Sequence, residues 1–263
     1  MAALNITPLG PRAGARLVLA GGAGGIGRAL TDACLANGYE VAVLDLAASI
    51  DAHPRREDVH YVPFEGGIAS SIEAACAQVA VRWKAIDGFV FLSGFPILPR
   101  RPLTGISVEQ WDELMAVNLR SAYLLWSGLA PLLEQADSPA VVTVASSLGY
   151  QVMPGMGAYA SSKAGLVGLT KAIAMESAPR VRANAVAPGA VDTDFLGGGT
   201  GRPIAEGNRS WFDDMADRYA AMIPLGRVAE PDDIVGPILF LLGPASSYMT
   251  GQVLHLNGGR LTP

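Results

Sequence analysis

The chain has 263 residues, of which 50% are hydrophobic and only 16% are charged. This composition supports a sizeable core and is unlike that of a disordered chain. The formal net charge of −5, without any run of Lys and Arg, argues against nucleic acid as the main partner.

The sequence contains no segment expected to direct the chain into a membrane. Its start lacks a basic stretch followed by a long apolar one, and its longest apolar runs, such as Ile238 to Leu242, fall far short of a membrane span. We therefore expect a soluble cytoplasmic protein. Cys34 and Cys76 each lie in a helical pattern and are expected to be free, buried thiols. The three scattered histidines predict no metal site.

The N-terminal part of the chain has the order of a dinucleotide-binding unit. A strand from Arg16 to Ala20 leads into a glycine-rich turn at 21–27, and a helix is predicted from Arg28 to Asn37. A second strand, Val41 to Leu44, ends at Asp45. Glycines let the backbone approach a pyrophosphate at the helix N-terminus, and an acid at this place accepts hydrogen bonds from ribose hydroxyls.

Asp45 also bears on which dinucleotide is bound. Its carboxylate would repel a 2′-phosphate, and Leu46 supplies no cation to hold one. The sequence therefore predicts NAD rather than NADP as the cofactor.

Strands and helices alternate through the rest of the chain. The predicted strands are Val59 to Phe64, Gly88 to Leu92, the run beginning at Val141, Val181 to Val186, and Val253 to Leu256. The predicted helices are Ser70 to Lys84, Val108 to Leu133, Tyr159 to Ser177, and Pro231 to Leu242. This alternation predicts a doubly wound α/β fold: a parallel, mostly seven-stranded sheet with helices on both faces, in one domain over residues 1–263.

The stretch from Val141 to Lys163 carries the candidate chemistry. Ser146 ends a buried strand, and Tyr159 and Lys163 lie four residues apart on the following helix, so they share one face. An adjacent ammonium would lower the pKa of a phenol from its usual value near ~10. Ser146 could then hold a substrate oxygen while Tyr159 protonates or deprotonates it.

These motifs, taken together and in order, resemble the short-chain dehydrogenase/reductase family, single-domain branch, from about Leu17 to Gly259. The family's glycine motif, catalytic set, helix asparagine, proline-glycine turn and C-terminal tail are matched by the following residues: Gly21, Gly25 and Gly27; Ser146, Tyr159 and Lys163; Asn118; Pro188-Gly189 with Val191 and Thr193; and Asn257 to Gly259. The resemblance implies a Rossmann fold and hydride transfer between a nicotinamide and a carbonyl or alcohol carbon.

The resemblance also implies a role for each matched residue. Tyr159 would be the general acid/base, Lys163 would lower its pKa and bind the nicotinamide ribose, and Ser146 would hold the carbonyl oxygen. Asn118 would anchor a water in the proton relay. The residues expected to bind the cofactor are Gly21, Gly25, Ile26, Gly27, Asp45, Glu65, Gly66, Ser93, Gly94, Tyr159, Lys163, Pro188, Gly189, Val191 and Thr193.

The chain departs from the family pattern near the glycine turn. Ala20 stands where a threonine is usual, and Phe91-Leu92-Ser93-Gly94 replaces Asn-Asn-Ala-Gly. We hypothesise that Ser93 offers the hydroxyl that Ala20 lacks. Glu65 stands where an aspartate is common beside the adenine.

The loops beyond the predicted strand ends suggest an apolar substrate. They carry Phe95, Pro96, Ile97, Leu98, Tyr150, Val152, Met153 and Met156, and the segment 194–222 adds Phe195, Leu196, Trp211, Phe212 and Met215 among several glycines. We expect this segment to be a mobile substrate lid. Arg100 and Arg101 could meet an anionic substrate, but adjacent arginines beside prolines are more often part of a solvated loop.

We therefore expect a small hydrophobic ketone or secondary alcohol as substrate. An NADP(H)-dependent 3-oxoacyl reductase is an alternative, although 131–138 contains two acids and no cation to dock an acidic carrier protein. A non-catalytic dinucleotide sensor is a second alternative. The helices at 110–133 and 159–177 are apolar nearly all round, which predicts a homodimer or homotetramer.

Overall fold

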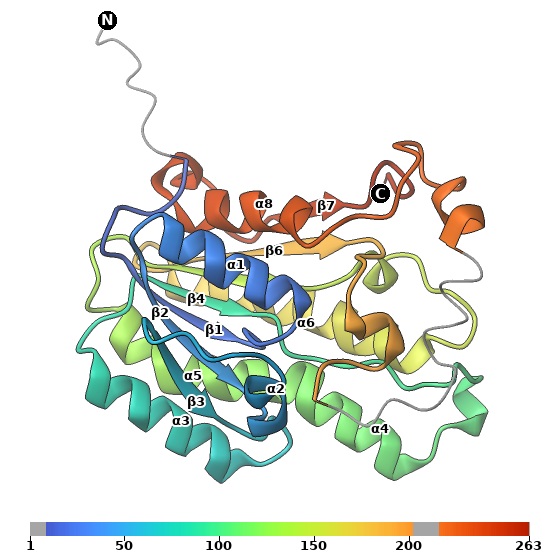
Figure 1. The fold of residues 1–263 in the computed structure, drawn as a ribbon, viewed down its shortest axis with the longest axis horizontal. Helices are drawn as coiled ribbons and strands as arrows, with labels where there is room; N and C mark the ends of the chain where they lie inside the picture. The colour runs from blue at the N-terminus through green and yellow to red at the C-terminus, as the bar shows by residue number, and fades with distance from the viewer. Residues whose placement is uncertain (1–8, 202–215, 263) are drawn as a thin grey trace, which may run out of the picture.

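The computed structural model describes residues 9–201 and 216–262. Its seven strands form one parallel sheet in the order β3-β2-β1-β4-β5-β6-β7, with helices above and below it (Figure 1). The strands are β1 Arg16–Ala20, β2 Glu40–Asp45, β3 Val59–Pro63, β4 Gly88–Phe91, β5 Ala140–Val144, β6 Arg182–Pro188 and β7 Val253–Leu256. The predicted doubly wound, single-domain fold is confirmed.

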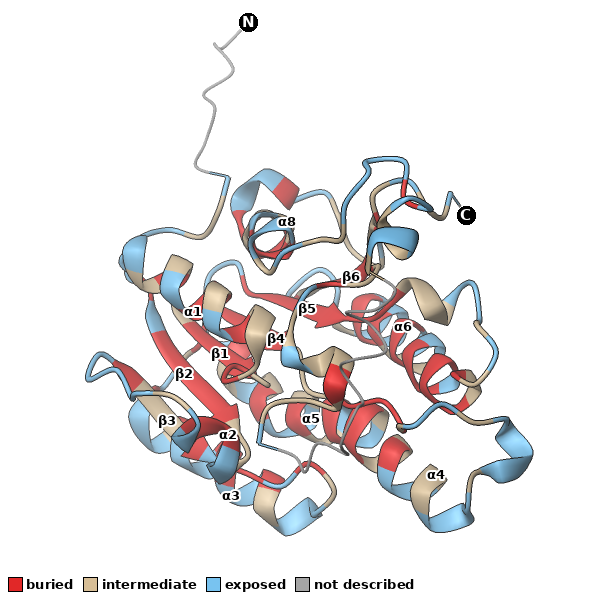
Figure 2. Ribbon diagram, turned by 45° about the vertical axis from the view of Figure 1, so that its right-hand side comes forward, coloured by how far each residue is buried: buried red, intermediate tan, exposed pale blue. Residues whose placement is uncertain are grey.

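The helices divide between the two faces of the sheet. They are α1 Gly25–Ala36, α2 Ala47–Asp51, α3 Ala69–Arg82, α4 Val108–Met115, α5 Ser121–Leu133, α6 Gly157–Ser177 and α8 Asp232–Leu242. Leu17 and Leu19 pack toward α1 and α8, whereas Val18 and Ala20 pack toward α3, α5 and α6. Alternate residues of a strand point to opposite faces, so β1 contributes to two cores. In Figure 2 most of the sheet is coloured as buried, and the helices beside it are buried on one side and exposed on the other.

Two predicted helices differ from the structure, one in its first residue and the other in its interior. Helix α1 begins at Gly25 and not at Arg28, because Gly25 and Gly27 form its first turn and are needed there for close packing. The predicted helix from Val108 to Leu133 has the expected ends, but its middle is a π-helical segment, η2 Ala116–Arg120, between α4 and α5. Such segments commonly lie at functional sites, and this one carries Asn118.

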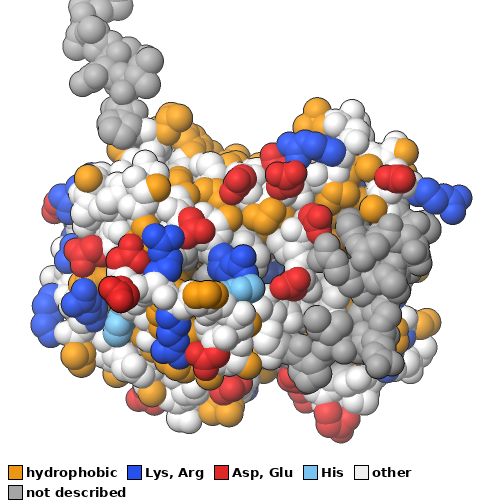
Figure 3. Space-filling view, viewed as in Figure 1, with side chains coloured by type: hydrophobic (Ala, Val, Ile, Leu, Met, Phe, Trp, Pro, Cys, Tyr) orange, Lys and Arg blue, Asp and Glu red, His pale blue; other side chains and the backbone are white. Residues whose placement is uncertain are grey.

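None of the helices in the described ranges combines the length and apolarity needed to cross a bilayer. On the face seen in Figure 3, acidic and basic side chains are interspersed and form no basic patch. The expected lid at 194–222 lies partly outside the described residues, and Trp211, Phe212 and Met215 are among those not described.

Candidate active site

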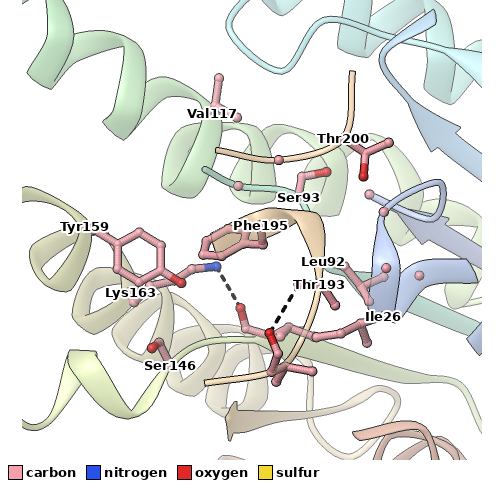
Figure 4. A pocket seen from close by; sticks show the side chains of 18 of the residues that line it. Ile26, Leu92, Ser93, Val117, Ser146, Tyr159, Lys163, Thr193, Phe195 and Thr200 are labelled. Carbon is pink, nitrogen blue, oxygen red and sulfur yellow. Dashed lines mark hydrogen bonds between the residues drawn. The ribbon is translucent and has the colours of Figure 1, made fainter. Parts of the chain in front are cut away.

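A cavity of about 320 Å³ opens beyond the carboxyl ends of the strands (Figure 4). This is where ligands bind in open parallel sheets. Every residue expected to bind the cofactor lines this cavity, as do Ser146, Tyr159 and Lys163. Asn118, the remaining residue with an expected catalytic role, does not line the cavity; it lies buried behind the cavity wall.

The glycine turn after β1 is required by close packing. Gly21 has a φ of +85°, and a Cβ there would lie 2.6 Å from the Ser93 nitrogen. A Cβ on Gly25 would overlap the methyl group of Thr193, and one on Gly27 would overlap the Gly21 carbonyl. No side chain caps the first turn of α1, and Gly24, Gly25 and Ile26 of this turn line the cavity. An uncapped helix N-terminus of this kind can bind an anion.

Asp45 braces this turn. Its carboxylate accepts hydrogen bonds from the Ala23 nitrogen at 2.9 Å and from the Leu46 nitrogen at 2.8 Å. Both Asp45 and Leu46 also line the cavity. The carboxylate therefore fixes the glycine turn and sets the negative charge of the same wall.

The hypothesis that Ser93 replaces a missing threonine hydroxyl is wrong. Within the described part of the chain, the Ser93 hydroxyl makes no hydrogen bond to the glycine turn; the Ser93 backbone packs against Gly21 instead. The end of β1 is held by backbone hydrogen bonds, from Leu92 N–H to the Ala20 carbonyl at 2.7 Å and from Gly21 N–H to the Leu44 carbonyl at 2.8 Å. A side-chain hydroxyl is not needed there.

Helix α6 brings Tyr159 and Lys163 to one wall of the cavity, as the spacing predicts. Their exposed fractions are 7% and 2%. The Lys163 ammonium donates to the Val144 carbonyl at 2.8 Å and lies 5.7 Å from the centre of the Tyr159 ring. Ser146 lies two residues after the end of β5, and its side-chain oxygen accepts a hydrogen bond from the Leu148 nitrogen at 3.1 Å. Its O–H remains a donor toward Tyr159 or a substrate.

The pKa values of this pair are governed by burial. Burial raises the pKa of Tyr159 above its usual value, and the hydrogen bond with Ser146 offsets only part of that shift. Burial also lowers the pKa of Lys163 to about 8. In this structure burial therefore outweighs any lowering of the Tyr159 pKa by Lys163, because the ammonium donates to the Val144 carbonyl and both groups are desolvated.

The side-chain amide of Asn118 makes three hydrogen bonds. Its Oδ1 accepts from the Phe95 nitrogen at 3.0 Å, and its Nδ2 donates to the Phe95 carbonyl at 3.0 Å and to Ser162 Oγ at 3.1 Å. A Cβ on Gly94 would lie 3.1 Å from Asn118 Oδ1 and 3.4 Å from Lys163 Nζ. Asn118 thus fixes the backbone that borders Lys163, and its role in a water relay stays a prediction.

The substrate side of the cavity is apolar. Leu148, Met153, Met156, Phe195 and Leu196 line it. The Phe195 ring lies 5.7 Å from the Tyr159 ring, centre to centre. Phe95 and Ile97 instead belong to a buried cluster behind the cavity.

Other loop residues lie elsewhere than the sequence suggests. Tyr150 and Val152 are 39% and 59% exposed and do not line the cavity. Arg100 lines the cavity, and it is exposed, as expected for a solvated loop. Ser49 and Thr200 also line it; no local motif marks them, since only the tertiary fold brings them together.

Comparisons with known proteins give a consistent result. A family model described as enoyl-(acyl carrier protein) reductase matches residues 21–260. The probable galactose dehydrogenase GalD of Rhizobium meliloti (strain 1021) is 28% identical over 252 residues, which cover 92% of this chain and 93% of that protein. The 3-oxoacyl-(acyl-carrier-protein) reductase FabG of Staphylococcus epidermidis is 28% identical over 250 residues, covering 92% and 97%.

A solved structure is similarly related. A putative NAD(P)-dependent gluconate 5-dehydrogenase from Beutenbergia cavernae, with NADP bound at low occupancy, is 31% identical with a TM-score of 0.83. The match covers 97% of this chain and 99% of that one. By name these relatives are oxidoreductases that differ in substrate.

Proposed function

Because the chain belongs to the short-chain dehydrogenase/reductase family, we propose that it is an NAD(H)-dependent oxidoreductase that interconverts a secondary alcohol and a ketone. Members of this family bind a nicotinamide dinucleotide. The observation that carries the proposal is the meeting of Ser146, Tyr159 and Lys163 in one cavity with the uncapped first turn of α1.

The residues of the groove fit a dinucleotide. The amides of the first α1 turn would hold its pyrophosphate, since Gly21 and Gly25 leave no side chain in the way. Asp45 would accept hydrogen bonds from the adenosine ribose, and its negative charge favours NAD over NADP. Lys163 would bind the nicotinamide ribose, and Val191 and Thr193 would contact the nicotinamide carboxamide and the phosphates. The bound cofactor supplies or accepts the hydride.

The side chains of this chain handle the proton. In ketone reduction the Tyr159 hydroxyl donates its proton to the substrate oxygen, and in alcohol oxidation the phenolate takes it back. The Ser146 hydroxyl holds the same oxygen by a hydrogen bond. The Lys163 ammonium, fixed on the Val144 carbonyl, stabilises the phenolate that forms during reduction.

The apolar wall favours a hydrophobic substrate. Met153, Met156 and Phe195 surround the Tyr159 side of the cavity, and a hydrophobic ketone would bury its surface against them. Arg100 at the same cavity offers a cation to a polar or anionic substituent.

A second candidate is a 3-oxoacyl reductase, favoured by the FabG relative and by the description of the matching family model. Against it, residues 131–138 contain Glu134 and Asp137 and no cation that could dock an acidic carrier. A non-catalytic dinucleotide sensor would not need the proton donor Tyr159.

The experiment compares NADH and NADPH oxidation with a panel of hydrophobic ketones, a 3-oxoacyl thioester and a keto sugar. Tyr159→Phe should lower kcat/KM at least about 100-fold while leaving NADH binding intact. Tyr248→Phe removes a phenol hydroxyl at a fully exposed position and is the matched control. If both proteins bind NADH and neither turns over any substrate, the sensor interpretation replaces the enzymatic one.

We further propose a homodimer or homotetramer formed through α5 and α6. Tyr123 on α5 and Met175 on α6 are large apolar side chains that are exposed in the isolated chain. A second subunit would cover them. Light scattering should give a mass of two or four chains, and a monomeric mass would contradict this proposal.

A further inference from the structure

The segment that follows β6, residues 193–201, spans the cavity; we refer to it as the strap. At one end the Thr193 side chain packs against Gly25, and the Phe195 ring lies against the Tyr159 ring. At the other end the Ser49 hydroxyl donates a hydrogen bond to the Thr200 carbonyl at 2.7 Å. The strap therefore joins the catalytic helix to α2, near the end of β2.

The Ser49–Thr200 contact is closely fitted. Ser49 is only 2% exposed. Gly201 has a φ of +73°, and a Cβ there would lie 2.5 Å from the Ser49 nitrogen and 2.5 Å from its hydroxyl oxygen. A residue larger than glycine at 201 would be strained in its backbone and would also push the strap off α2.

The strap is also braced internally. The Gly199 nitrogen donates to the Asp194 carbonyl at 3.1 Å, and the Thr200 hydroxyl donates to the Asp194 carboxylate at 3.3 Å. Gly198 has a φ of +125°, which allows the reversal between the two ends. The strap is thus a compact loop that is anchored at both ends.

The strap covers both halves of the groove. Asp45, Leu46 and Ser49 form the wall where the adenosine ribose is proposed to bind, and Gly199 and Thr200 line the same cavity. Figure 4 shows Thr193, Phe195 and Thr200 around the cavity that Tyr159 and Lys163 also border. A dinucleotide reaching from Asp45 to Tyr159 would therefore lie beneath the strap.

We propose that the Ser49–Thr200 hydrogen bond is a clasp that retains the dinucleotide, so that bound cofactor leaves only when the strap lifts from α2. This inference rests on the proposed function, because it assumes that the groove binds a dinucleotide. It assigns Ser49 and Gly201 to cofactor release, a role that neither residue's sequence context indicates. Tyr159 and the proton chemistry are not involved.

The test measures release of NADH by stopped-flow fluorescence after mixing the complex with excess NAD⁺, in the wild type, Ser49→Ala and Gly201→Ala. Losing one neutral hydrogen bond should raise the release rate about 3- to 10-fold in Ser49→Ala. Gly201→Ala should raise it at least as much, because it displaces the strap. Association rates should change less than release rates.

Two controls match the chemistry of the changes. Ser70→Ala removes a hydroxyl from an exposed serine on α3 that does not line the cavity. Gly38→Ala introduces a Cβ at the same φ of +73° with no atom within 4 Å, so it carries the backbone strain without the contact. Both should release NADH within about two-fold of the wild type.

An unchanged rate of NADH release in both Ser49→Ala and Gly201→Ala would overturn the clasp. The proposed function would still stand if the wild type oxidises NADH with a ketone. If Gly201→Ala fails to fold by circular dichroism, Ser49→Ala alone decides. Wild-type protein that binds neither NADH nor NADPH would overturn the clasp and the proposed function together. If NADPH alone binds, the same release experiment is run with NADPH.

Discussion

The side-chain amide of Asn118 holds both polar groups of the Phe95 backbone, each at 3.0 Å. A third hydrogen bond, to Ser162, ties the π-helical segment η2 to α6. The loop after β4 is thereby fixed between the two helices that face it. Gly94, which precedes Phe95, lies against Lys163, so the position of the catalytic ammonium depends on this arrangement.

Replacing Asn118 with Ala should therefore reduce stability and activity together. The change removes both hydrogen bonds between the buried Phe95 backbone and the amide, which should lower the free energy of unfolding by about 2–4 kcal/mol. We expect kcat/KM to fall at least about 10-fold, since Lys163 loses a fixed neighbour. Urea denaturation and steady-state kinetics measure the two effects.

The matched control is Asn37→Ala. Its amide makes one exposed hydrogen bond, to the Ala33 carbonyl at 2.8 Å, and its loss should cost less than about 1 kcal/mol. A stability loss no larger in Asn118→Ala than in Asn37→Ala would contradict the structural role assigned to Asn118.

The pH dependence of ketone reduction should reflect Lys163. Burial lowers the pKa of Lys163 to about 8, so the ammonium loses its proton as the pH rises through that value. The raised pKa of Tyr159 keeps the phenol protonated over the same range. Without the ammonium the developing phenolate is less stable, and kcat/KM for reduction should fall above pH 8 or so.

Lys163→Arg provides the check, because a guanidinium stays charged to about pH 12. The residual reduction activity of this variant should keep its level to higher pH than that of the wild type. A wild-type profile that is flat from about pH 6 to about pH 10 would show that the charge of Lys163 does not matter for the proton transfer.

The order of strands, helices and motifs along the chain and the chemistry of the site could both be predicted from the sequence. Both depend on residues that are close together in the chain. The spacing of Tyr159 and Lys163 places them on one helix face, and the buried run before Ser146 places that serine at a strand end. The place of Asp45 at the end of β2 was predicted in the same way. These features depend on a few neighbouring residues and on the periodicity of helix and strand.

What the sequence did not reveal depends on contacts between distant segments. The Ser49–Thr200 hydrogen bond joins residues 151 positions apart, and nothing near Ser49 distinguishes it from an ordinary helix serine. The pKa of Tyr159 was expected to fall because its spacing from Lys163 was visible and its burial was not. Likewise the glycines at 25 and 27 were assigned to a turn, although they serve packing inside α1.

The two cysteines should be unreactive in the folded protein. Cys34 and Cys76 are buried free thiols, and burial raises their pKa values from 9.0 to about 12 and about 11. Above pH 9 the thiols of the unfolded chain ionise, whereas burial keeps both thiols of the folded chain protonated. The free energy that the two cysteines contribute to folding is therefore lost as the pH rises above 9. A thiol-reactive chromogen at pH 8 or so should label neither cysteine natively and both in denaturant. Rapid labelling of native protein would contradict this burial.

The choice of cofactor should be adjustable at Leu46. Its side chain lines the cavity beside Asp45, whose carboxylate is already engaged by the Ala23 and Leu46 nitrogens. Leu46→Arg keeps those backbone hydrogen bonds and adds a cation that can pair with a 2′-phosphate. One charge-assisted hydrogen bond should raise the affinity for NADPH about 10-fold while changing that for NADH less.

Leu46→Gln is the control, since it is polar and of similar length but uncharged, and it should leave the preference for NADH largely unchanged. Removing the carboxylate as well, in Asp45→Ser with Leu46→Arg, should shift the preference further but also loosen the turn at Ala23, so both affinities need to be measured by titration. Wild-type protein that binds NADPH more tightly than NADH would refute the assignment of Asp45, because a carboxylate at this wall repels the added phosphate.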